Sequence, residues 1–137
     1  MASSLEDIEG YLQKLERRYE KLEAGTLLVS MGQGQSPVAL LVAPPVVVLQ
    51  VGITDVPPAK SDAEAAVNAP LFRKLLELNA NDLVHAAYGL ENDRIVLASA
   101  LDLANLGLSE LEAVLADMEM ALANHVPVLR GMVEKKD

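Results

Sequence analysis

Few residues in this chain of 137 residues could take part in chemistry. It has no cysteine, and its only two imidazoles are His85 and His125. Neither histidine has another histidine three or four positions away, and Asp82 and Asp117 do not stand at a recognisable metal-site spacing from them. Thiol nucleophiles, thiolate zinc sites and iron–sulfur clusters are therefore excluded, and we expect no metal requirement. Both histidines are expected to be structural or to lie at the surface.

A glycine-rich segment, Met31–Pro37, is the one stretch with the composition of a phosphate-binding loop. Such a loop needs a lysine followed by Ser or Thr and then a helix, so that backbone N–H groups and the lysine converge on the phosphate. Here Pro37 leads into a predicted strand and no lysine is present, so we expect a hairpin loop. Ser30, Ser36 and Ser99 lack the context of a catalytic nucleophile. We predict no catalytic residues and no cofactor-binding residues.

Carboxylates are the most abundant candidates, because 20 Asp and Glu stand against 11 Lys and Arg, a formal net charge of −9. This charge argues against nucleic-acid partners, since phosphate backbones would repel the protein. Most of the carboxylates fall on predicted helix faces, where a solvated surface is the usual state. A catalytic acid–base pair is recognised by geometry, so a cleft that uses carboxylates on a small molecule stays open as an alternative.

The elements that position these residues begin with a helix. Apolar residues recur in steps of three and four along residues 5–22, which predicts a helix from Leu5 to Leu22. Ser3 and Glu6 have the spacing of a capping box, and Gly25 is a candidate C-terminal stop.

Three strand-like segments follow, at Leu27–Met31, Pro37–Ala43 and Val46–Ile53. Pro44 and Pro45 cannot donate ladder hydrogen bonds, so we expect a tight reversal there. The third segment is an almost continuous β-branched run, which is typical of a strand covered on both faces. Its candidate contacts with a second subunit or a partner are Val46, Val48, Leu49 and Val51.

A second helix is expected after the capping-box pair Ser61 and Glu64, with Pro70 interrupting or restarting it and Asn79 as its C-terminal cap. Two further strands, Leu83–Leu90 and Arg94–Leu101, form a hairpin around a polar turn at residues 91–93.

A last helix opens at the pair Ser109 and Glu112, and Pro127 is expected to kink or shorten it. The order is helix, three strands, helix, two strands, helix. Adjacent antiparallel strands separated by helices predict an α+β two-layer sandwich with a five-stranded antiparallel sheet. We assign residues 1–137 to a single domain.

The composition also bears on assembly and location. The chain is 51% hydrophobic and 23% charged, with a mean hydropathy of +0.23. This leaves more apolar surface than a core of this size readily hides, so we expect a homodimer. The most apolar stretch, residues 38–53, is interrupted by prolines and is shorter than the ~20 residues of a membrane-spanning helix, so no membrane association is expected. The acidic N-terminus does not resemble a secretory signal, and we expect a cytoplasmic protein.

Three stretches carry a family resemblance: Ala43–Leu49, Leu75–Asn79 and Ala87–Leu97. The proline-marked strand, the helix ending in Leu-x-Leu-Asn and the hairpin with a short polar turn resemble the YbjN family and, more distantly, type III secretion chaperones. The resemblance covers nearly the whole chain. It implies an α+β domain, frequent homodimers and binding of a polypeptide by a bacterial chaperone-like or regulatory module that needs no cofactor. The alternatives are the small-molecule or catalytic domain and a purely structural, self-associating subunit.

Overall fold

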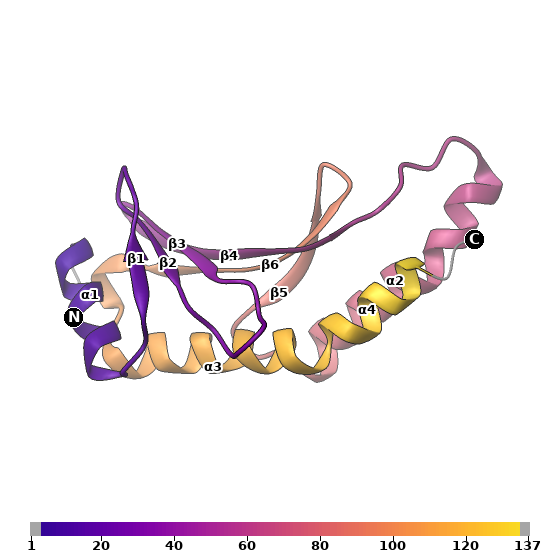
Figure 1. Cartoon of the computed structure of the whole chain (residues 1–137). Coiled ribbons are helices and arrows are strands. Elements are labelled where there is room, and N and C mark those ends of the chain that lie inside the picture. Colours follow the sequence, from indigo (N-terminus) through magenta and orange to yellow (C-terminus); the bar gives the residue numbers. More distant parts are fainter. Residues whose placement is uncertain (1–3, 135–137) are drawn as a thin grey trace.

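The computed structural model describes residues 4–134. It confirms the α+β class: one antiparallel sheet is covered on one face by helices, and the other face carries no helix (Figure 1). The sheet has six strands, one more than expected, in the order β1-β2-β3-β4-β6-β5. The strands are β1 Tyr19–Lys21, β2 Thr26–Val29, β3 Val38–Ala43, β4 Val46–Asp55, β5 Ala87–Glu91 and β6 Arg94–Asp102.

The helices are α1 Leu5–Lys14, α2 Asp62–Asn81, α3 Leu108–Asn124 and α4 Val126–Glu134, with a short 3-10 turn at Leu103–Asn105. Helix α3 runs beneath the sheet in Figure 1, and α2 and α4 extend past its β5 end. The core lies between these layers. Along β4 every second residue is buried, because strand side chains alternate between faces. The inward residues of β4 are Val47, Leu49, Val51 and Ile53, and those of α3 include Leu111, Val114, Leu115 and Met118.

The prediction of a helix to Leu22 was wrong beyond Lys14, where α1 ends eight residues earlier than expected. Glu16 has a φ of 57°, which ends the helix, and the chain then pairs as β1 with β2, Tyr19 lying opposite Val29. Tyr19 fits the three-and-four spacing of the predicted helix, but it also fits a half-buried strand. Gly25, expected to stop the helix, instead lies in the β1–β2 turn with a φ of 75°.

Both predicted tight turns are confirmed. Pro44 and Pro45 form the connection between β3 and β4, where Ala43 pairs with Val46. Asn92 and Asp93 join β5 to β6 with φ values of 50° and 62°. Polar residues of this kind tolerate the left-handed backbone that a two-residue hairpin requires.

The helix termini gave a mixed result. Ser61 caps α2 as expected, with its Oγ accepting the N–H of Glu64 at 3.2 Å. Pro70 does not interrupt this helix. Ser3, predicted to cap α1, lies outside the described residues, and the cap is Ser4, whose Oγ accepts the N–H of Asp7 at 3.3 Å.

Helix α3 begins after Gly107, so the Ser109–Glu112 cap was wrong. The carboxylate of Glu110 accepts the Gly107 N–H at 2.8 Å and also the Ser109 hydroxyl at 2.9 Å. These two hydrogen bonds lower the pKa of Glu110, the one from the Ser109 hydroxyl more than the one from the Gly107 N–H. The helix ends at Asn124 and α4 starts at Val126, which agrees with the expected effect of Pro127.

Candidate partner-binding surface

The open face is the side of the sheet that no helix covers, and its centre is apolar and built from small or β-branched side chains. The pairing register places Leu41, Val48 and Ala100 side by side across β3, β4 and β6. The next row toward the other end of β4 holds Ala39, Gln50 and Ala98. Leu41 is 39% exposed although it stands in the middle of a sheet. This face can accept apolar side chains from another chain.

The four sequence candidates divide between the two faces of β4. Val46 and Val48 are partly exposed on the open face. Leu49 and Val51 point the other way and belong to the core, at 0% and 5% exposure. Period-two alternation separates the two pairs, but because the residues of both pairs are apolar, the sequence does not show which pair faces the core.

The β1 edge of the sheet has unpaired backbone groups. The C=O of Arg18 accepts from Ser30 N–H at 2.9 Å, and the N–H of Leu22 donates to Thr26 C=O at 2.8 Å. Since bonded residues alternate in an antiparallel pair, the N–H and C=O groups of Tyr19 and Lys21 point away from β2. A wide hollow of about 700 Å³, lined by residues 21–23 and Thr26, adjoins this edge.

The β5 edge is blocked at Tyr88 by a side chain. The Oδ1 of Asn79, on α2, accepts the N–H of Tyr88 at 2.7 Å, and its Nδ2 donates to the C=O of Tyr88 at 3.1 Å. The carboxamide thereby makes the two hydrogen bonds that a neighbouring strand would make. The prediction that Asn79 caps the helix was wrong, because α2 continues to Asn81 and ends at Asp82.

The segment before β5 is held by one carboxylate. Asp117 of α3 accepts the N–H groups of Val84, His85 and Ala86 at 3.2, 2.9 and 3.0 Å. The expected strand at Leu83–Leu90 was therefore wrong at its start: the Leu83 N–H donates to the Leu78 carbonyl, residues 84–86 bond to the Asp117 side chain, and β5 begins at Ala87.

A chain of hydrogen bonds joins His125 to two groups that are distant in sequence. The imidazole, 5% exposed, places Nδ1 at 2.9 Å from the Tyr88 hydroxyl and Nε2 at 3.0 Å from Asp82 Oδ2. Burial above all, and then the carboxylates of Asp82 and Asp117, raise the pKa of Tyr88 above its ordinary value. The hydroxyl thus stays protonated at neutral pH, and its hydrogen bond with the imidazole ties β5 to the α3–α4 junction.

These hydrogen bonds connect parts of the fold to one another. Tyr88 is buried, at 7% exposure, and its hydroxyl is used within the protein by His125. His85, the other histidine, has an exposed side chain, and its backbone C=O accepts the Ser99 hydroxyl at 2.8 Å. Within residues 4–134, no group of three or more His, Asp or Glu side chains could hold a metal ion.

The glycine-rich segment is a hairpin loop, as expected. Residues 31–37 lie in the connection between the antiparallel strands β2 and β3. Of the helices in the described part of the chain, none has the length and apolar character needed to cross a bilayer.

Comparison with known proteins agrees with this architecture. Residues 1–135 match the model of the CesT_Tir_1 family, a family of type III secretion chaperones. No curated protein sequence matches the chain.

Solved structures share the fold. A chain of the heterodimeric ExoU–SpcU complex from the type III secretion system of Pseudomonas aeruginosa is 16% identical, with a TM-score of 0.67 over 90% of this chain and 98% of that one. The Yersinia pestis type III secretion chaperone SycH, in complex with a fragment of YscM2, is also 16% identical, with a TM-score of 0.59 over 93% and 99%. YbjN from E. coli is 14% identical, with a TM-score of 0.58 over 91% and 96%. The chain therefore belongs to the CesT_Tir_1 family and is a chaperone-like, polypeptide-binding module.

Proposed function

We propose that this protein holds an extended segment of a partner polypeptide against the β1 edge and catalyses nothing. The observation that carries the proposal is the outward N–H and C=O of Tyr19 and Lys21, next to a hollow where Leu22 is 39% exposed. An added strand would pair with these groups and place alternate side chains beside Leu22 and Thr26. SycH, which shares the fold, was solved in complex with a polypeptide fragment.

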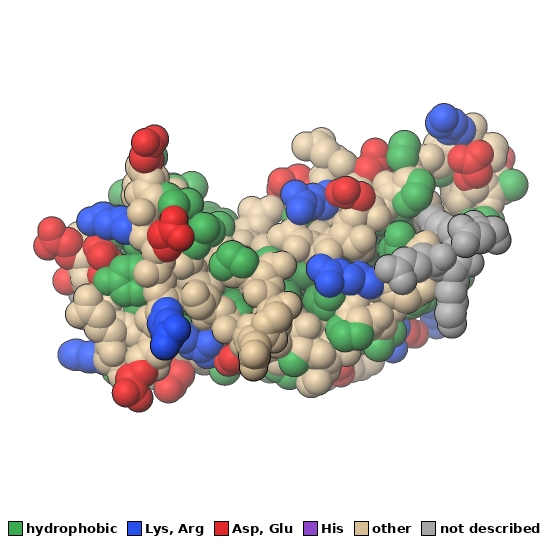
Figure 2. Space-filling view, viewed as in Figure 1, with side chains coloured by type: hydrophobic (Ala, Val, Ile, Leu, Met, Phe, Trp, Pro, Cys, Tyr) green, Lys and Arg blue, Asp and Glu red, His purple; other side chains and the backbone are tan. Residues whose placement is uncertain are grey.

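The charge of the protein suggests the chemistry of the partner. With a net charge of −9, the protein attracts basic segments at long range, repels acidic ones and leaves neutral ones unaffected. In Figure 2 acidic and basic side chains are interspersed at the end of the molecule that carries α1 and β1, so the expected attraction comes from the net charge of the whole chain. We therefore expect a basic partner segment whose association slows as salt rises.

We further propose that the protein is a homodimer whose subunits meet through the open face, at Val46 and Val48. Both side chains are partly exposed, with Val48 opposite Ala100 and Val46 opposite Asp102, and a second copy would bury them. We keep the cytoplasmic location as part of the proposal, because a chain without cysteine needs no oxidising compartment to fold.

The partner proposal is tested by capture from extracts of the native cell, followed by strand-edge variants. Lys21→Pro removes an outward N–H, and we expect the captured partner to bind about tenfold more weakly or worse, while Lys60→Pro, on an exposed loop, leaves binding unchanged. Equal binding by both variants would exclude the β1 edge. A turnover abolished by changing one carboxylate, with no polypeptide recovered, would favour the small-molecule alternative.

The dimer proposal is tested by light scattering at micromolar concentration. Val48→Glu places a carboxylate in the proposed interface and should yield monomers, whereas Thr54→Glu, beyond the register shift near the end of β4, should leave dimers intact. Circular dichroism identifies any variant that fails to fold. A wild-type mass of 14.6 kDa would contradict the dimer.

A further inference from the structure

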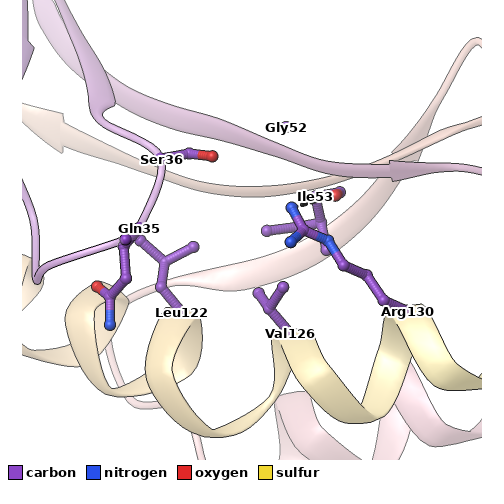
Figure 3. A pocket seen from close by; sticks show the side chains of 8 residues that line it. Gln35, Ser36, Gly52, Ile53, Leu122, Val126 and Arg130 are labelled. Atoms are coloured by element: carbon purple, nitrogen blue, oxygen red, sulfur yellow. Dashed lines mark hydrogen bonds between the residues drawn. The ribbon is translucent and has the colours of Figure 1, made fainter.

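A cavity of about 100 Å³ lies on the helix side of the sheet, apart from the β1 edge and the open face. Its walls come from three regions distant in sequence: the β2–β3 connection at residues 34–36, β4 at Gly52 and Ile53, and the helices α3 and α4. Figure 3 shows Leu122 and Val126 pointing up from the helices and the guanidinium of Arg130 turned toward β4 at Ile53. The cavity has an apolar floor and a cationic wall.

Arg130 is an exposed residue that makes no ion pair with the described carboxylates. Arg17, Arg73 and Arg94 each lie within 4 Å of a carboxylate, at 2.9, 3.3 and 3.8 Å. Among the side chains that the structure describes in residues 4–133, Arg18 and Arg130 have no such partner, and of these two it is Arg130 that lines the cavity. Its guanidinium makes a long 3.5 Å hydrogen bond to the Ile53 carbonyl. In a protein of net charge −9, carboxylates are plentiful, so a guanidinium that faces a cavity without one is a candidate anion ligand.

The opposite wall supplies uncharged donors on a well-defined loop. Gln35 fixes the loop, because its Oε1 accepts the Gly32 N–H at 3.0 Å and its own N–H donates to the Gly32 C=O at 3.0 Å. Gly34 adopts a φ of 77°, which turns the chain so that Ser36 follows along the cavity wall. In Figure 3 the Ser36 side chain extends from the loop toward Gly52, across from Arg130.

We infer that this cavity binds an oxyanion, a carboxylate or a phosphate group, with Arg130 as the charged ligand and Ser36 as a hydroxyl donor. The planar guanidinium fork matches two oxygens of either group. A volume of about 100 Å³ suits one such group with a small body resting on Leu122 and Val126, and not a nucleotide or a peptide. The inference does not depend on the proposed polypeptide function, because none of these residues belongs to the β1 edge or the open face.

The test is a titration of the whole isotope-labelled protein with sodium phosphate and, separately, with sodium acetate, at constant ionic strength maintained with chloride. Saturable shifts of the Gly34, Ser36 and Ile53 amide resonances with either ion support the site, and the ion that saturates identifies phosphate or carboxylate as its chemistry. If neither phosphate nor acetate produces a saturable shift, the inference is wrong.

Variants locate the binding group. Arg130→Gln should weaken binding by about tenfold or more and Ser36→Ala by about threefold, since a charged hydrogen bond contributes more than a neutral one. Arg73→Gln removes the same charge from an exposed α2 position and should leave binding unchanged. Equal weakening by Arg130→Gln and Arg73→Gln would show only a general charge effect and refute the site. Ser36→Ala keeps the test decisive if Arg130→Gln does not fold.

Discussion

The two edges of the sheet differ in how their backbones are paired. At β5, the outward N–H and C=O of Tyr88 are both bonded to the side chain of Asn79. At β1, the outward groups of Tyr19 and Lys21 have no such clamp. Exposed strand edges invite pairing with other chains, and proteins usually block them. A helix side chain blocks the β5 edge at Tyr88, whereas no side chain bonds the outward groups of Tyr19 and Lys21, so β1 is the more accessible edge for strand addition.

The largest effect is expected from Asp117→Ala, which releases the segment that leads into the closed edge. Three backbone N–H groups lose a charged acceptor, so we expect the free energy of unfolding to fall by about 3 kcal/mol. Urea denaturation followed by circular dichroism measures this change. Glu112→Ala, an exposed carboxylate on the same helix, is the control and should change stability little. Equal effects of the two variants would contradict the role of Asp117.

Asn79→Ala should open the β5 edge itself. It leaves the N–H and C=O of Tyr88 without partners, and we expect a loss of about 2 kcal/mol. Hydrogen exchange at the Tyr88 amide should accelerate toward the rates of Tyr19 and Lys21. Asn81→Ala, two residues further along the helix and exposed, serves as the matched control. Unchanged protection of Tyr88 in Asn79→Ala would mean that the clamp does not close the edge.

Tyr88→Phe tests the inner side of the same strand. His125 Nδ1 loses its partner, and we expect a loss of about 1 to 2 kcal/mol at neutral pH. Burial raises the pKa of Tyr88, so the folded protein keeps a proton that the unfolded chain releases near pH ~10. Stability contributed by Tyr88 is therefore complete below that pH and falls as pH rises further. Denaturation between pH 8 and 11 should show a steeper decline for wild type than for Tyr88→Phe, and parallel curves would contradict this.

The smallest effect is expected at the open edge. Lys21→Pro should cost less than about 1 kcal/mol of stability, because the Lys21 N–H has no partner in the sheet and proline is tolerated at edges. Glu20→Pro removes an N–H from a position whose backbone faces β2, and it should cost more. Thermal denaturation of the pair measures the difference. A larger loss for Lys21→Pro than for Glu20→Pro would reverse our assignment of the outward groups.

Sequence reasoning predicted the elements whose signals are local. The two turns, the cap at Ser61 and the strands around Pro44 and Pro45 follow from the preferences of the residues that form them. The sixth strand could not be predicted, because Tyr19 fits a helical stripe and a half-buried strand equally well, and its pairing with Val29 is a tertiary event.

The candidate site was less accessible from the sequence. Asn79 has the ordinary look of a helix cap, and only the position of β5 shows that its carboxamide serves a strand. Asp82 and His125 are 43 positions apart, so their contact follows from the packing of α2 against α4. Nothing in the sequence of the loop at residues 31–37 indicates that Arg130, almost a hundred positions later, lines the same cavity, because only the folded chain brings them together.

The position of β4 and β6 at the centre of the sheet has a consequence for the order of folding. Hairpins β1–β2, β2–β3, β3–β4 and β5–β6 join neighbours in the sequence, but β4 and β6 pair Val46 with Asp102 and Asp55 with Arg94 across the whole of α2. Closing that long loop costs chain entropy before the pairing stabilises anything. We therefore expect the β1–β4 segment and the β5–β6 hairpin to form first, and the pairing of β4 with β6 to limit the folding rate. Until that pairing forms, a newly made chain exposes the backbone edges of both central strands.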